Sequence, residues 1–183
     1  MSLMDKLKST TQSLFSKKSK TPDRRRKGTN FHDAKSVALL YVDKDEEHFK
    51  RIKSYVKYLH DEFGIRRVLA YGYVNQSEKT IPLWQTHKLE FDFFTPADLS
   101  WSMQPGQSLQ TFINEEFDVL IDTSAQDCDP LRFVLQNSHA KMKVGWDKGA
   151  GSEFCDLMIS IDSYDFDRLL EQTSSVLTNM TLV

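Results

Sequence analysis

The sequence predicts an α/β fold, a three-layer Rossmann-like sandwich with a mostly parallel sheet of five or six strands. Short apolar runs alternate along the chain with stretches whose apolar residues recur at three- and four-residue steps. The run at residues 36–42 is apolar at nearly every position, as in a strand that is covered on both faces. With 183 residues, 39% of them hydrophobic, the chain can bury a core without metals or disulfides.

The elements follow one another in a regular order. After the first strand, residues 43–46 offer a carboxylate cap, and a helix with apolar residues at helical spacing runs to Phe63, where Gly64 ends it. A second strand at residues 67–74 completes a strand, helix, strand unit with a right-handed crossover. Further strands are expected at residues 89–94, 118–122, 143–146 and 156–161.

Helices are expected between and after these later strands. Thr95 caps a short helix that reaches Trp101, Ser108 caps the next helix, and Asp129 caps the one after it. An apolar stripe that starts at Phe166 forms the last helix. The alternation of strands and helices therefore continues to the end of the chain.

The net charge of -2 combines two segments of opposite sign. Nine Lys and Arg and two Asp lie within residues 1–28, which carry +7, and the remainder carries -9. We interpret residues 1–30 as a basic arm, amphipathic as far as Phe15 and a flexible linker over residues 16–30, and residues 31–183 as a single α/β domain. The basic side chains expected to bind an anionic surface are Lys17, Lys18, Lys20, Arg24, Arg25, Arg26 and Lys27, and the expected apolar anchor is Leu3, Met4, Leu7, Leu14 and Phe15.

This charge pattern favours a non-enzymatic binding module that the arm holds on an anionic surface. RNA, within a ribosomal particle, suits the crowding of basic residues, because each cation placed on a phosphate releases counterions. The inner surface of an anionic membrane suits an amphipathic helix followed by a polybasic stretch. The charge pattern is also consistent with a protein partner, and it does not predict the oligomeric state. The sequence has neither a long apolar run nor a signal peptide, so we expect a cytoplasmic protein, free or peripheral to the inner membrane.

The alternative function is a Rossmann-like enzyme acting on a nucleotide or a sugar nucleotide, with its pocket at the carboxyl ends of the strands. The pattern there resembles the phospho-acceptor pocket of receiver domains, but no aspartate follows the third strand as acceptor. The sequence also lacks a paired acid and base, so we assign no catalytic residue; Asp43 and Asp122 are equally consistent with a cap and a strand end. The possible pocket residues are Asp43, Asp122, Thr123, Ser124, Trp146, Asp147 and Lys148.

Neither a metal nor a cofactor is expected. The five His residues have no partners at zinc-ligand spacing. Cys128 and Cys155 have no CxxC spacing, and we interpret them as structural thiols. Cys128 precedes a helix start that could lower its pKa, but no His lies near it in the sequence to act as a base.

Several segments of the chain are similar to those of one known family. They are residues 35–41, 94–101, 115–122 and 155–159. In these segments the chain resembles an uncharacterised bacterial family, from the Bacteroidota, of small α/β proteins with a basic N-terminal segment. The resemblance implies a cytoplasmic bacterial protein, and it implies no activity and no catalytic residues.

Overall fold

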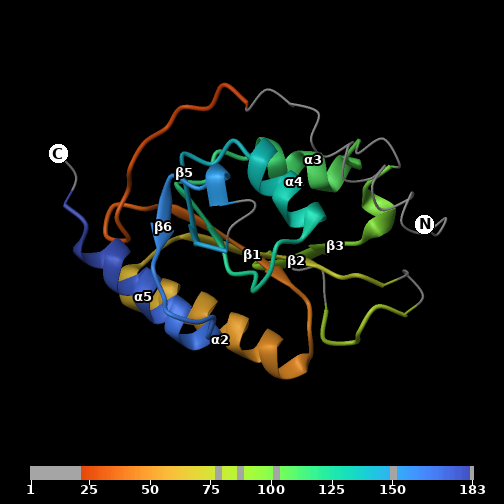
Figure 1. The fold of residues 1–183 in the computed structure, drawn as a ribbon, viewed down its shortest axis with the longest axis horizontal. Helices are drawn as coiled ribbons and strands as arrows, with labels where there is room; N and C mark the ends of the chain where they lie inside the picture. The colour runs from red at the N-terminus through yellow and green to blue at the C-terminus, as the bar shows by residue number, and fades with distance from the viewer. Residues whose placement is uncertain (1–21, 77–79, 86–88, 101–103, 149–151, 182–183) are drawn as a thin grey trace.

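The computed structural model describes residues 22–76, 80–85, 89–100, 104–148 and 152–181. Its centre is a six-stranded sheet with the strand order β3-β2-β1-β4-β5-β6, in which all neighbouring strands are parallel (Figure 1). This is the Rossmann-like α/β arrangement that the sequence predicts. The strands are β1 (Ser36–Val42), β2 (Arg67–Tyr73), β3 (Phe91–Phe94), β4 (Val119–Asp122), β5 (Met142–Trp146) and β6 (Leu157–Ile159).

Helices cover both faces of the sheet. Figure 1 shows α2 and α5 together on one face and α3 and α4 on the other. The α-helices are α2 (Glu46–Phe63), α3 (Gln107–Asn114), α4 (Asp129–Asn137) and α5 (Phe166–Asn179), and the short 3₁₀ helices are η2 (Pro96–Asp98) and η3 (Ser152–Phe154).

The core has two halves, one on each face of the sheet. Val37, Leu39 and Tyr41 of β1 pack into the half beneath α2 and α5. Ala38 and Leu40, the alternate residues, pack into the half beneath α3 and α4. All five side chains are fully buried, which explains why the sequence of β1 is apolar at successive positions.

The ends of α2 lie where the sequence predicts them. The Asp45 carboxylate accepts a hydrogen bond from the backbone N–H of His48 at 2.7 Å, which satisfies a donor of the first helical turn. Gly64 ends the helix with φ 64°, a left-handed conformation that glycine adopts without a Cβ clash.

Three other helix boundaries differ from the prediction. The N-cap of α3 is Gly106, so Ser108 lies inside the helix. The N-cap of α4 is Cys128, so Asp129 is the first helical residue, where its carboxylate faces the positive end of the helix dipole. Thr95 is the predicted cap, but η2 ends at Asp98 instead of reaching Trp101, which lies outside the described residues.

All six strands begin at one edge of the sheet and end at the opposite edge, because they are parallel. We call these the amino edge and the carboxyl edge. The strand order reverses between β1 and β4, so the carboxyl edge next to these strands is the position where open α/β sheets usually bind ligands. Among the helices that the structure describes, none has both the length and the apolar character that a bilayer crossing requires.

Candidate functional site

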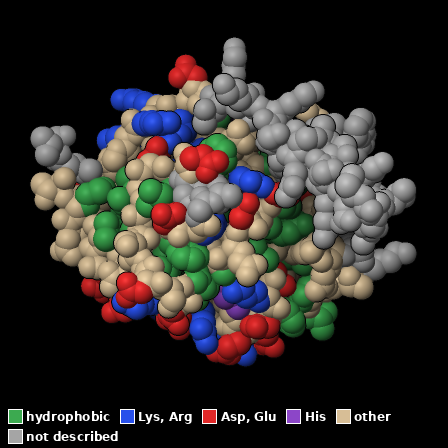
Figure 2. Space-filling view, viewed as in Figure 1, with side chains coloured by type: hydrophobic (Ala, Val, Ile, Leu, Met, Phe, Trp, Pro, Cys, Tyr) green, Lys and Arg blue, Asp and Glu red, His purple; other side chains and the backbone are tan. Residues whose placement is uncertain are grey.

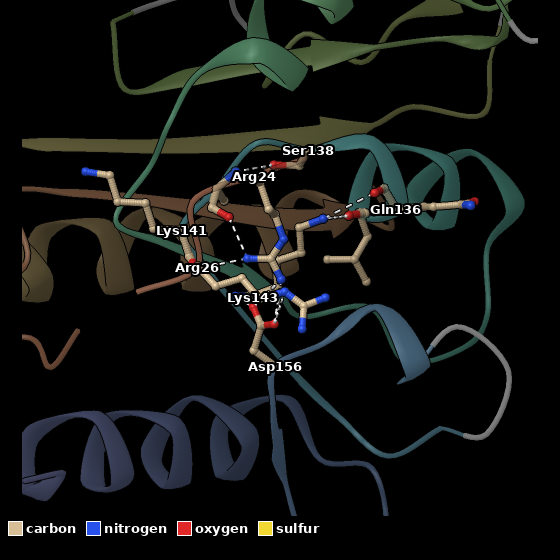
Figure 3. A network of polar contacts seen from close by, with 9 residues as sticks. Arg24, Arg26, Gln136, Ser138, Lys141, Lys143 and Asp156 are labelled. Atoms are coloured by element: carbon tan, nitrogen blue, oxygen red, sulfur yellow. Dashed lines mark hydrogen bonds and ion pairs between the residues drawn. The ribbon is translucent and has the colours of Figure 1, made fainter. Parts of the chain in front are cut away.

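Arg24 fixes the last part of the arm to the amino edge of the sheet, and we call residues 24–31 the docked segment. Its Nη1 donates to the carbonyl oxygens of Ala140 and Lys141, each at 2.9 Å. Its Nη2 donates to both carboxylate oxygens of Asp156, at 2.5 and 2.6 Å (Figure 3). The Arg24 side chain is only 3% exposed. This residue therefore acts as an internal anchor, and its guanidinium is already engaged.

The rest of the segment continues along the same edge. The backbone N–H of Lys27 donates to the carbonyl of Lys141 at 3.1 Å, and that of Phe31 donates to the carbonyl of Leu177 at 2.9 Å. The Phe31 side chain is fully buried in the core. The flexible linker predicted over residues 16–30 therefore differs from the structure in its last part. The difference arises because the segment's partners lie much later in the chain, just before β5 and β6 and in α5.

A hollow of about 560 Å³ lies between this docked segment and the starts of β5 and β6, and we call it the basic pocket. Figure 2 shows Lys and Arg side chains gathered at the upper left, along the segment drawn orange in Figure 1. Cations outnumber anions in the lining. The charged lining residues are Arg24, Arg26, Lys27, Lys141, Lys143, Glu153 and Asp156.

Two of these cations form close ion pairs with carboxylates. Arg24 binds Asp156, and Lys141 Nζ donates to the Asp118 carboxylate at 2.8 Å. Burial acts to raise the pKa of Asp118, but hydrogen bonds from Lys141 and from backbone N–H groups outweigh it and lower the pKa. Arg26 forms a longer and exposed ion pair: its Nε lies 3.7 Å from the carboxylate of Asp156, and its side chain is 70% exposed.

Lys143 is buried in the wall of the pocket. It is 1% exposed, and its Nζ donates to the carbonyls of Leu135 and Gln136, at 2.5 and 3.3 Å (Figure 3). These carbonyls lie in the last turn of α4, which attracts positive charge. Burial, and next the nearby charge of Arg24, lower the pKa of Lys143 to about 7. Its charge at neutral pH is therefore partial, and the exposed positive charge of the pocket comes mainly from Arg26 and Lys27.

A second cluster lies at the carboxyl edge. Lys148 Nζ contacts the Asp122 carboxylate and lies 2.5 Å from Ser124 Oγ. Ser124 Oγ in turn donates to Asp122 at 2.6 Å. The side chains of Lys148 and Asp122 are only 7% and 3% exposed. The sequence predicted these three residues as part of one pocket, and the structure brings them together.

The cluster is arranged as an internal ion pair. An ammonium group bound to a carboxylate is a poor general base, so Lys148 is not placed to activate Ser124 as a nucleophile. The hollow beside Asp122, which Cys128 and Arg132 also line, has no room for a water-sized sphere. This arrangement suits a structural link between β4 and the end of β5 better than a reaction centre.

Aromatic side chains close the turn that follows β4. Trp146 Nε1 donates to the carbonyl of Ser124 at 3.0 Å, and the Tyr164 hydroxyl donates to the carbonyl of Thr123 at 2.9 Å. Lys44 lies 5.3 Å from the centre of the Tyr164 ring, a cation–π contact. In the part of the chain that the structure describes, Trp146 and Tyr164 therefore cover the turn after β4, where a Rossmann-type ligand would enter.

Asp43 has different hydrogen-bond partners from the residues of this cluster. Its carboxylate accepts hydrogen bonds from Trp84 Nε1 at 3.2 Å and from Gln85 Nε2 at 2.7 Å. These bonds connect Asp43 to the loop after β2. Asp147 is exposed. The possible pocket is thus only partly assembled.

Comparisons with known proteins agree with the family resemblance seen in the sequence. A family described as being of unknown function, DUF6913, matches residues 6–180. The chain belongs to the DUF6913 family. No curated protein and no solved structure matches it.

The arm of this DUF6913 protein is only partly described by the structure. Arg25, Arg26 and Lys27 are exposed, and Arg24 is the internal anchor. The other predicted arm residues, Lys17, Lys18, Lys20, Leu3, Met4, Leu7, Leu14 and Phe15, lie outside the described residues.

Both cysteines of the DUF6913 protein lie near the Asp122–Lys148 pair. Burial raises the pKa of the Cys128 thiol, and it raises that of Cys155 to about 12. Both thiols are therefore protonated at neutral pH, which leaves them weak nucleophiles. Within the described residues no group of three His, Cys, Asp or Glu side chains could hold a metal ion.

The sequence interpretation missed Asp156 as the partner of the arm, and it missed the burial of Lys143. One signal was present, because Lys143 is a lysine inside a strand that was expected to be covered on both faces. A buried lysine needs carbonyl or carboxylate partners. The partners of Lys143 lie on α4, seven and eight residues earlier in the chain. The pairing of Arg24 with Asp156 depends instead on strand order, which the sequence did not predict.

Proposed function

We propose that this DUF6913 protein is a non-enzymatic module that binds RNA through the basic pocket and the arm that leads into it. The observation that carries the proposal is the docking of the arm by Arg24 at a pocket with surplus positive charge. Arg26 and Lys27 are exposed at its rim. Cations held at a fixed place on a folded domain can contact phosphates with less loss of side-chain and backbone freedom than cations on a free chain.

The position of exposed apolar residues favours RNA over a membrane as the partner. The large apolar side chains that are exposed in the described residues do not line the basic pocket and do not belong to the docked segment. A peripheral membrane site usually combines basic residues with an apolar face that enters the lipid. These exposed side chains are Tyr58, Leu83, Leu89, Met158 and Val176.

The charge of the remaining residues favours one orientation of the protein on the RNA. Residues 1–28 carry +7 and the remaining residues carry -9. An RNA molecule would therefore be attracted to the arm and repelled by the domain as a whole. This asymmetry favours contact at the amino edge and leaves the carboxyl edge facing away.

The salt dependence of RNA binding tests this proposal. Each phosphate contact with a single strand contributes a slope of about 0.7 in log K against log salt. The variant Arg25→Ala/Arg26→Ala/Lys27→Ala should therefore reduce the slope by about 2, measured by fluorescence anisotropy with a single-stranded RNA. Arg24 is left unchanged, because its removal would also undock the segment.

A matched control removes the same number of charges elsewhere. Lys50, Lys53 and Lys57 are exposed on α2, and replacing all three with Ala should leave the slope nearly unchanged. Cosedimentation of the wild type with purified ribosomes and with anionic vesicles separates the two candidate surfaces. Binding to vesicles and not to RNA would support the membrane alternative. Binding to neither at low salt would show that the proposal is wrong.

A further inference from the structure

The basic pocket also has an apolar side, which simple attraction to phosphates does not require. Its volume of about 560 Å³ lies within the roughly 300–1,000 Å³ that is usual for small-molecule sites. Phe154 is half-buried there and leaves part of its ring surface available. The apolar lining residues are Met142, Phe154, Leu157 and Met180.

We propose that the basic pocket binds the terminal nucleotide of an RNA strand whose end carries a phosphomonoester. This proposal rests on the RNA-binding function above. The phosphate lies against Arg26 and Lys27, and the base packs on Phe154 and its apolar neighbours. Aromatic side chains commonly stack on the bases of single strands.

The charges of the pocket favour a terminal phosphate over an internal one. Arg24 binds Asp156 closely, and Arg26 lies 3.7 Å from the same carboxylate with its side chain 70% exposed. Arg26 and Lys27 therefore supply most of the exposed positive charge. A phosphomonoester carries about 1.5 to 2 negative charges at pH 7, whereas an internal diester carries about one. Two adjacent cations therefore match the monoester better.

Competition binding tests the proposal. Three unlabelled RNA strands of one sequence, with a 5′-phosphate, with a 3′-phosphate and with hydroxyl groups at both ends, compete against an internally labelled RNA at fixed salt. We expect one phosphorylated strand to compete about tenfold better than the strand with two hydroxyl ends, as for a charge-assisted hydrogen bond. Equal competition by all three strands would overturn the pocket assignment and leave RNA binding intact.

Substitutions test whether the preference for a terminal phosphate comes from the basic pocket. Arg26→Ala/Lys27→Ala should reduce the preference for the phosphorylated strand to less than about twofold. Arg25→Ala removes an exposed arginine that does not line the pocket. It should therefore weaken the binding of all three RNA strands by the same factor and keep the preference for the phosphorylated strand. If Arg25→Ala abolished the preference equally, the phosphate would be bound by the arm in general and the proposal would be wrong.

A nucleoside monophosphate separates a strand end from a free nucleotide. It should compete more weakly than the phosphorylated strand, because it lacks the contacts that the arm makes with the rest of the RNA. If it competed equally well, the pocket would belong to free nucleotides and the strand-end proposal would fail. If the protein bound no RNA at all, both this proposal and the RNA-binding function would fail.

Discussion

Arg24 and Arg25 are neighbours in the sequence with opposite environments. The Arg24 side chain is 3% exposed and holds Asp156 and two backbone carbonyls, whereas Arg25 is exposed. Arg24→Ala should therefore lower the free energy of unfolding by about 2–4 kcal/mol, because it leaves Asp156 and the carbonyls without their donor. Arg25→Ala should change it by less than about 0.5 kcal/mol. Urea denaturation of both variants measures the difference, and equal stabilities would contradict the anchoring role.

The burial of His48 should make the stability of the folded protein sensitive to acid. The residue is 8% exposed, and neither ring nitrogen has a hydrogen-bond partner among the described residues. Burial, and next the charge of Lys44, lower its pKa below the usual 6.5. The unfolded chain therefore binds a proton more readily than the folded protein does. The contribution of neutral His48 to the free energy of unfolding is fully present above about pH 6.5. As the pH drops below this value, the free energy of unfolding falls by at most about 1.4 kcal/mol per pH unit.

The variant His48→Leu should remove this part of the pH dependence. Its free energy of unfolding, measured by urea denaturation between pH 7.5 and pH 5, should fall less than that of the wild type. His32 is exposed, so His32→Gln serves as the control and should retain the acid sensitivity. If both variants followed the wild-type curve, protonation of His48 would not limit stability.

Among the elements, the Tyr41 ring of β1 lies against Gly72 of β2 and leaves no room for a side chain there. Gly72 is paired with Tyr41 across the two strands, and a Cβ at Gly72 would lie 2.5 Å from Cζ of the Tyr41 ring. Tyr41 is fully buried, and its hydroxyl donates to Gln85 at 3.2 Å, so the ring has little freedom to move. Gly72→Ala should lower the free energy of unfolding by about 1–3 kcal/mol. A melting temperature equal to that of the wild type would show that Tyr41 can shift.

The elements themselves were largely predictable, because they depend on local patterns. The apolar run of β1 and the Asp45 and Gly64 ends of α2 require only neighbouring residues, and these predictions are confirmed. The caps of α3 and α4 are displaced by one or two residues, since several residues near each start can serve as caps.

The docked segment and the basic pocket could not be predicted in the same way. Arg24 is 132 residues away from Asp156 along the chain, and nothing in its local sequence separates it from Arg25 or Arg26. The cluster of Asp122, Ser124 and Lys148 was easier to predict, because the carboxyl ends of parallel strands meet at one edge. Its closed geometry depends on side-chain packing, which the sequence pattern does not contain.

At the scale of the whole molecule, the two edges of the sheet are chemically separate. The amino edge carries the exposed basic pocket, and the carboxyl edge carries a buried ion pair beneath aromatic side chains. β5 connects them, and its five residues separate them by roughly 16 Å at 3.3 Å per residue. Changes at one edge should therefore have little effect on the other.

This separation predicts how the carboxyl edge responds to substitution. Lys148→Met alone should cost about 3–5 kcal/mol in stability, because it leaves Asp122 buried and unpaired. The double variant Asp122→Asn/Lys148→Met should recover part of that loss and bind RNA with the affinity of the wild type. Denaturation and anisotropy measure the two effects. If the folded double variant lost RNA binding, the carboxyl edge would belong to the functional surface.

The docking of Arg24 also determines when the fold can be completed during synthesis. Its partners Ala140, Lys141 and Asp156 lie 116, 117 and 132 residues further along the chain. At about 5–20 residues per second, a ribosome needs about 7–26 s to add the residues between Arg24 and Asp156. The basic segment is thus made well before the residues that hold it, and it is among the last parts to be fixed in place. Throughout that interval its positive charges are available to any polyanion near the site of translation.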